Sequence, residues 1–271
     1  MEPIVGVLLG GVLLFNAVVT PGRAEKQAEK ALRKKYPGAT VNVEIEGKRG
    51  RDVLNGRFKN VRVELSNVKI DGFPIESKKI ETSDPSNPDA PKVKVGTMGH
   101  LELQLRDMTF GDLPVKSASL SFDDVQYDFK ALKKDSDVRL IAFSNGKIAL
   151  TVEAPALVPT VSRRAPEILN PVVELSGGEI IVSGRREVLG LGANVKVRGA
   201  VVARGKILEV DNPRVEVAGL KITPLIANPL LKGVNPLYKF DEDGKWPLNL
   251  QIERVTADQG LLQIEGALTL K

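Results

Sequence analysis

The sequence contains no cysteine and a single histidine, His100, among its 271 residues. The lack of cysteine excludes disulfides and thiolate metal sites, and it leaves the redox environment of the chain open. One histidine without cysteine cannot build a zinc site or a histidine-based catalytic triad. Aromatic residues make up only 4% of the chain, which is low for a protein that stacks on single-stranded nucleic acid.

The charge of the chain is also unconcentrated. The 39 basic residues exceed the 34 acidic ones by only five, and they are scattered as pairs and short clusters. Such a pattern is typical of a solvated surface, or of weak attraction to an anionic membrane. No basic run is dense enough to predict a nucleic-acid partner.

Motifs for catalysis or cofactor binding are absent or incomplete. Residues 190–192 begin like a dinucleotide-binding glycine motif, but its third glycine position is Val195. Residues 241–244 (DEDG) resemble the start of a calcium loop, yet the glycine comes two positions early and the bidentate glutamate is missing. We therefore predict a protein that is not an enzyme and that has no metal site or cofactor.

The longest hydrophobic run lies at the N-terminus. Residues 4–19, IVGVLLGGVLLFNAVV, contain one polar side chain, Asn16. As a helix the run would span about 24 Å, slightly less than a hydrocarbon core of about 30 Å. We favour an uncleaved membrane anchor within residues 1–22 over a signal peptide, because no basic residue precedes the run and no A-x-A site follows it. The candidate anchor residues are Ile4, Val7, Leu8, Leu13, Leu14 and Phe15.

Strand patterns dominate the rest of the chain, after one amphipathic helix. Residues 21–36 place alanine, leucine and tyrosine at helical spacing, and Pro37 ends the pattern. Residues 41–45 and 61–65 alternate between apolar and polar. After residue 65 the apolar positions shift from odd to even numbers, which predicts a β-bulge near Asn67.

Turn signals divide the later strands. Residues 144–147 (SNGK) predict a hairpin turn between strands at 138–142 and 148–152. Residues 82–91 (TSDPSNPDAP) predict a flexible loop. A closing hairpin is expected from residues 246–254 and 260–270, with Leu248 opposite Leu262.

This inventory predicts an α+β fold. About ten strands with roughly three helical segments favour a long, curved, mainly antiparallel β-sheet with helices laid on one face. We expect residues 23–271 to form a single domain.

One face of the stretch 194–217, NVKVRGAVVARGKILEVDNPRVEV, is aliphatic. Two proline-broken segments, 155–171 and 223–240, carry further aliphatic residues and cannot pack on a sheet as continuous helices. They either close a dry core or leave a groove that suits an acyl chain, and the pattern alone leaves both open. The candidate wall residues are Val195, Val197, Val201, Leu208, Val210, Leu157, Val161, Ile168, Leu169, Leu225, Ile226, Leu230 and Leu231.

The order of several segments adds a resemblance. The chain carries, in this order, AEKQAEKAL, GRFKNVRVELSNVKIDG, GGEIIVSGRREVLGLGANVKVRGAVVARGKILEV and WPLNLQIERVTADQGLLQIEGALTL. Over residues 21–271 this order resembles the bacterial LmeA-like family of phospholipid-binding proteins. The resemblance implies a TULIP-like fold, in which a curved sheet wraps around a long helix and encloses an apolar tunnel. It also implies a phospholipid or other acyl-chain lipid as ligand, and a role in the cell envelope.

The resemblance and the charge pattern disagree on location. The resemblance implies a domain on the extracytoplasmic side of the membrane, in the periplasm or cell envelope. Arg23, Lys26 and Lys30 follow the hydrophobic run and only Glu2 precedes it, so the positive-inside rule favours the cytoplasmic side. We follow the resemblance and expect a membrane-anchored lipid-binding or transfer protein. The alternative is a structural or scaffolding β-domain that binds an unidentified protein partner.

Overall fold

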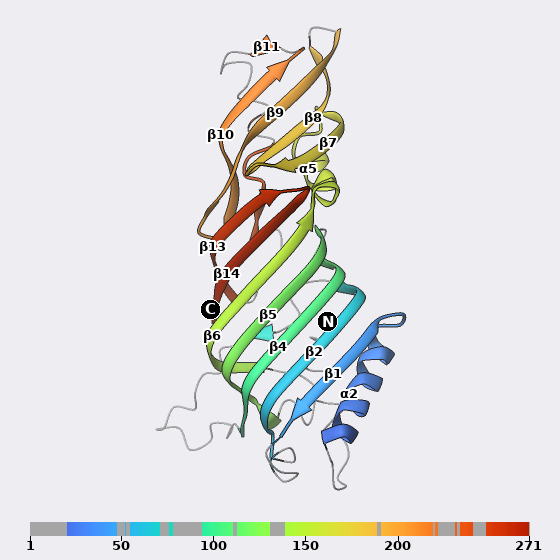
Figure 1. Cartoon of the computed structure of the whole chain (residues 1–271), viewed down its shortest axis with the longest axis vertical. Helices are drawn as coiled ribbons and strands as arrows, with labels where there is room; N and C mark the ends of the chain where they lie inside the picture. Colours follow the sequence, from blue (N-terminus) through green and yellow to red (C-terminus); the bar gives the residue numbers. More distant parts are fainter. Residues whose placement is uncertain are drawn as a thin grey trace, which may run out of the picture.

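Two twisted β-sheets, placed end to end along the longest axis, make up most of the computed structural model (Figure 1). The structure describes residues 21–47, 52, 55–70, 76–77, 94–110, 113–130, 139–188, 191–218, 220–221, 231, 234–240 and 248–270. The predicted anchor residues from Ile4 to Phe15 lie outside the described residues. So do the predicted loop 82–91 and the candidate wall residues Leu225, Ile226 and Leu230.

Sheet A forms the lower part of Figure 1 and curls around its apolar face. In spatial order it contains β1 (Thr40–Glu46), β2 (Arg57–Ile70), β4 (Val95–Phe110), β5 (Leu113–Asp128), β6 (Arg139–Glu153), β14 (Leu261–Leu270) and β13 (Leu248–Asp258), and β3 (Glu76–Ser77) pairs with β6. The β2–β4 and β3–β6 pairs are parallel, and the others are antiparallel.

Sheet B forms the upper part and is antiparallel throughout. Its strands in spatial order are β11 (Leu220–Lys221), β10 (Ile207–Val217), β9 (Leu191–Arg204), β8 (Glu179–Val188) and β7 (Leu169–Ser176), and β12 (Tyr238–Lys239) pairs with β10. The prediction of a mostly antiparallel, curved β-structure is confirmed, but two sheets replace the expected single one.

Helices contribute little within the described residues. The predicted amphipathic helix is α2 (Pro21–Lys35), whose Ala28 and Leu32 are fully buried against β1. Glu25 Oε1 accepts a hydrogen bond from Ile45 N at 3.0 Å, so α2 also covers the edge of sheet A. The 3-10 helix η1 (Ala154–Leu157) and α5 (Val158–Arg164) follow β6 and contact β7. In this part of the chain the helices lie at an edge and at the junction of the sheets, and the expected long helix inside a sheet is not among them.

Bulges and glycines curve both sheets. Asn67 has φ 61°, and the alternation of β2 changes phase there as predicted. Asp107 of β4 is left-handed too (φ 50°), and the two strands keep their register, so the irregularity is shared by both strands and is not the predicted bulge. In β10 the register shifts between Asp211 and Arg214, opposite Gly199 of β9. A Cβ at Gly199 would lie 2.6 Å from the Asp211 carbonyl oxygen. Glycine therefore lets the flat strand approach the bulged one closely, and the bulge bends the sheet.

The predicted hairpin turn at residues 144–147 is wrong. Strand β6 continues through it, and Asn145 has φ 47° within a bulge opposite β5. Asn145 Nδ2 donates to Asp123 Oδ2 at 3.2 Å, and a Cβ at Gly146 would lie 2.6 Å from the Leu268 carbonyl oxygen. Partner strands β5 and β14 on both sides of β6 keep the chain extended here, so no turn forms. Asn145 instead supplies the left-handed residue of the bulge, and Gly146 allows the close approach of β14.

Two glycine turns join the sheets. Gly178 N donates to Ala257 O at 2.8 Å, and Gly260 N donates to Leu175 O at 2.9 Å. The closing hairpin of β13 and β14 is confirmed, but β13 runs to Asp258, so Leu248 pairs with Leu270 instead of Leu262. The turns make the inner faces of the two sheets continuous, and one hydrophobic cluster extends across both.

Candidate lipid-binding site

The inner face of sheet B contains the aliphatic stripe predicted from residues 194–217. Val195, Val197 and Val201 of β9 and Leu208 and Val210 of β10 are between 1% and 8% exposed. Cross-strand pairs Val201–Val210 and Val197–Val215 keep these side chains on one side of the sheet. The structure therefore brings all five together in one apolar wall.

The first segment beside this wall is η1–α5 with the residues that follow it, and it packs on β7 at the other edge of sheet B. Leu157, Val161 and Ile168 are buried, as expected for its apolar side. Leu169 was predicted to join them and does not, because it is 51% exposed. It begins β7 opposite Arg185, and Asn170, with φ 51°, interrupts the alternation beside it.

The second segment, residues 234–240, lies along the edge of β10 beside the wall, with Leu231 partly buried next to it. Leu237 N donates to Leu208 O at 2.8 Å. The Asn235 side chain makes two hydrogen bonds with the backbone of Val210, accepting from its N–H at 3.2 Å and donating to its carbonyl at 3.1 Å. Asn235 thus replaces a strand neighbour along part of β10.

These residues were predicted to be helical from the sequence, but part of the segment forms strand β12 beside β10. Tyr238 and Phe240 are buried, with ring centroids 5.0 Å apart in an edge-to-face arrangement. Their spacing of two residues is the period of a strand, and β12 is the result. This alternation in the sequence could have predicted the strand. Nothing in the sequence could have predicted the hydrogen bonds of Asn235 with Val210.

One side chain ties the two covering segments to each other. Arg164, in the last turn of α5, donates from Nη1 to the Pro236 carbonyl oxygen at 2.6 Å. We call η1–α5 and residues 234–240 the cover. Its described attachments through Arg164 and Asn235 are hydrogen bonds to backbone groups, so they depend on the position of the backbone more than on matched side chains.

The inner faces carry almost no polar chemistry. Thr160 is the one buried polar or charged residue identified in the described part of the chain. The phenol of Tyr127, buried in sheet A, donates to Gly56 O at 2.9 Å, and burial raises the pKa of this phenol. A neutral, aliphatic interior accommodates hydrocarbon and disfavours ions.

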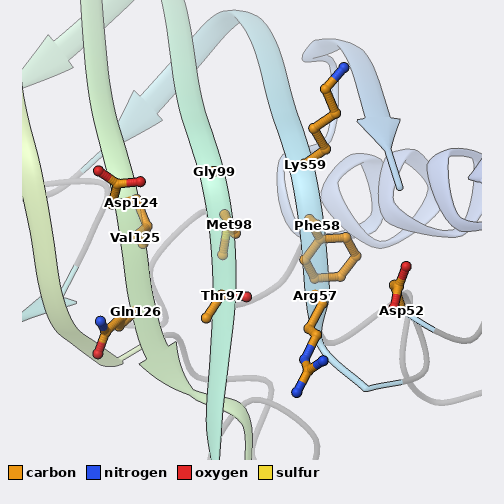
Figure 2. Close-up of a pocket in the computed structure, with 10 residues that line it drawn as sticks. All are labelled: Asp52, Arg57, Phe58, Lys59, Thr97, Met98, Gly99, Asp124, Val125 and Gln126. Atoms are coloured by element: carbon orange, nitrogen blue, oxygen red, sulfur yellow. The ribbon is translucent and has the colours of Figure 1, made fainter. Parts of the chain in front are cut away.

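A separate pocket of about 550 Å³ lies at one end of β2, β4 and β5 in sheet A (Figure 2). Figure 2 shows Arg57, Lys59, Asp52 and Asp124 around it. Lys59 pairs with Glu46 at 2.7 Å, and hydrogen bonds from Lys59 and Asn60 lower the pKa of Glu46.

Asp124 in that pocket accepts a hydrogen bond from Ser144 Oγ at 2.8 Å. Two charged groups of the pocket, Lys59 and Asp124, are thus engaged by neighbours, whereas the inner face of sheet B is uncharged. Across the described residues no group of three or more histidine or acidic side chains is arranged to hold a metal ion. Within the same residues, no helix is both long enough and apolar enough to cross a membrane.

Comparison with known proteins identifies one family. No curated protein and no solved structure matches the chain. The profile of the LmeA-like phospholipid-binding family matches residues 88–267, about two thirds of the 271 residues. The matched range runs from just before β4 into β14, so it includes the cover, the apolar wall and the junction between the sheets. The chain belongs to the LmeA-like phospholipid-binding family.

Proposed function

We propose that this protein binds a phospholipid, or another lipid with acyl chains, by holding the chains against the inner face of sheet B beneath the cover. The observation that carries this proposal is the apolar wall of β9 and β10, which contains no charged group. Family membership supports the same ligand class. The sequence features of a catalytic site are absent, so we propose binding or transfer of the intact lipid.

In the described state the wall is closed, since Val197 is 1% exposed and Leu208 2%. An acyl chain enters by taking the place of cover side chains. This exchange replaces one apolar contact with another, so most of the hydrophobic free energy, about 0.8 kcal/mol for each buried CH2, is retained. The hydrogen bonds of Arg164 and Asn235 then set much of the cost of opening.

We also propose that residues 4–19 anchor the chain in a membrane, with the folded part on the extracytoplasmic side and a role in the cell envelope. The hydrophobic run supports the anchor, and family resemblance supports the location. Transfer of lipid between this membrane and an acceptor follows naturally from a cover that opens.

A structural or scaffolding domain is the second candidate. The closed wall favours it, and so do the exposed Leu169 and Val172, because an exposed apolar patch is typical of a protein interface. Such a protein would have no use for a cover that opens.

Lipid exchange tests the proposal. Full-length protein is loaded with a fluorescent phospholipid and mixed with excess unlabelled vesicles, and the release rate is measured. Arg164→Gln removes the hydrogen bond to Pro236, worth about 1 kcal/mol, so we expect release about five-fold faster. Lys116→Gln, on the outer face of sheet A, serves as control and should leave the rate unchanged. Failure to load phospholipid contradicts the proposed function, and equal rates for wild type and Arg164→Gln contradict the role of the cover.

A further inference from the structure

The outer face of sheet B exposes aliphatic side chains at the end that lies away from sheet A. Leu169 and Val172 of β7 are 51% and 54% exposed. The opposite end of β7 is the turn at Gly178, which hydrogen-bonds to β13. These two residues and Val95 of β4 are the exposed large hydrophobic residues identified in the described part of the chain.

Basic side chains lie next to these aliphatic residues. Arg185 pairs directly with Leu169, and Lys196 lies on the next strand, paired with the Ser183 that faces Val172. A groove of about 420 Å³ is lined by Val172, Arg185 and Lys196, and Glu216 also contributes to it. We call Leu169, Val172, Arg185 and Lys196 the distal patch.

The cations of the distal patch are available to a ligand. Among the described residues, neither Arg185 nor Lys196 has a carboxylate within the 4.0 Å of an ion pair, although Glu216 is the cross-strand partner of Lys196. Some cations on the outer face of sheet A are engaged instead, because Lys116 pairs with Glu153 at 2.8 Å and Arg254 with Glu265 at 3.4 Å.

We propose that the distal patch docks on the surface of an anionic phospholipid bilayer. Exposed aliphatic side chains enter the boundary between headgroups and acyl chains. Each basic residue near an anionic surface then adds about 1 kcal/mol, a factor of about five in affinity. The two cations outnumber the single carboxylate of the groove, which favours an anionic surface over a neutral one.

This inference rests on the proposed lipid binding, since it names the surface at which the lipid is taken up or delivered. The patch also lies far from the helix that follows the predicted anchor. Helix α2 packs on β1, the edge of sheet A farthest from sheet B in the strand order. Figure 1 shows α2 and the upper end of sheet B at opposite ends of the molecule. Docking through the distal patch therefore uses a different end of the molecule from the predicted anchor, which precedes α2 in the chain.

A fluorescent label tests the proposal, because a chain without cysteine accepts a single introduced thiol. The full chain carrying Val172→Cys is labelled with an environment-sensitive NBD group and titrated with phosphatidylglycerol–phosphatidylcholine vesicles or with pure phosphatidylcholine vesicles. Val95→Cys, an exposed valine of sheet A, is the matched control. We expect a several-fold rise in emission at position 172 with anionic vesicles only, and no rise at position 95.

Charge variants sharpen the assay. Replacing both cations, as Arg185→Gln with Lys196→Gln, should raise the vesicle concentration at half-maximal response about 30-fold. Lys116→Gln, which removes one charge from sheet A, should change it little. No rise at position 172 overturns the proposal, as does an equal rise at position 95. An equal response to both vesicle types also overturns it, because charge then plays no part.

Measuring bound lipid in the same preparations separates the two proposals. A protein that holds phospholipid but shows no response at position 172 contradicts docking and leaves lipid binding intact. A protein that docks but never takes up phospholipid contradicts the proposed function and leaves docking intact.

Discussion

The two sheets bury similar faces and expose different ones. Inward, both present valine, leucine and isoleucine to one continuous core. Outward, sheet A pairs several of its cations with carboxylates, as in Lys59–Glu46 and Lys116–Glu153. At the far end of sheet B, by contrast, Arg185 and Lys196 lie beside exposed Leu169 and Val172 and have no carboxylate partner among the described residues. The inner faces thus share a packing role, whereas the outer face of sheet B has the chemistry of a contact surface.

This difference bears on what each surface can bind. Charges paired across strands satisfy each other and gain little from a partner, since exposed ion pairs contribute only about 0–1 kcal/mol. Unpaired cations beside exposed aliphatic groups gain from an anionic, apolar partner. This difference fits the proposal that sheet A acts as a support and that the far end of sheet B contacts lipid.

Core truncation has the largest expected effect and tests the similarity of the inner faces. Leu120 of sheet A is fully buried and Leu208 of sheet B is 2% exposed. Leu120→Ala and Leu208→Ala should each lower the free energy of unfolding by about 2–5 kcal/mol, from lost burial and the cavity left behind. Denaturant unfolding of the two variants measures both values.

Val95→Ala is the control for that comparison, because Val95 is half exposed and its truncation should change stability by less than about 0.5 kcal/mol. A cost below about 1 kcal/mol for Leu208→Ala alone would show that the inner face of sheet B is loosely covered. The two inner faces would then not be equivalent.

Acid sensitivity has the smallest expected effect and tests the paired outer face of sheet A. His100 Nδ1 lies 2.7 Å from Asp123 Oδ1, and hydrogen bonds with His100 and then Asn145 lower the pKa of Asp123. A carboxyl whose pKa is lower in the folded chain stabilises it above the ordinary aspartate pKa. That stabilisation disappears as the pH falls through the lowered value.

Asp123→Asn should therefore reduce the free energy of unfolding slightly near neutral pH, and the difference from wild type should vanish in acid. Unfolding followed from pH 7 down to about pH 2, below the ordinary aspartate pKa near 3.9, tests this. A difference that grows as the pH falls would contradict the assigned pair.

Local signals in the sequence explain which features were predictable. The slip in alternation after residue 65 marked the irregularity at Asn67, because a left-handed residue in a strand changes which face the following side chains occupy. The helical spacing of Ala28 and Leu32 likewise predicted α2 and its buried side. Both depend on neighbours along the chain.

Features that depend on distant partners were missed. Asn145-Gly146 has the composition of a hairpin turn, and only the strands on either side reveal it as a bulge. Leu169 was assigned to the buried side, because the sequence did not show that a strand begins there with a left-handed Asn170. The availability of Arg185 and Lys196 is a property of two facing strands, so alternation along one strand could not predict it.

Phospholipid binding itself is tested by native mass spectrometry. The full-length protein is delipidated and then incubated with a defined phospholipid. If the apolar wall binds phospholipid, we expect a complex with the added mass of the phospholipid. We expect that complex to be lost when Val197→Asp places a carboxylate in the apolar wall. Circular dichroism of the same variant checks that it remains folded. A wild-type protein that stays at its lipid-free mass with every phospholipid offered would contradict the proposed phospholipid binding.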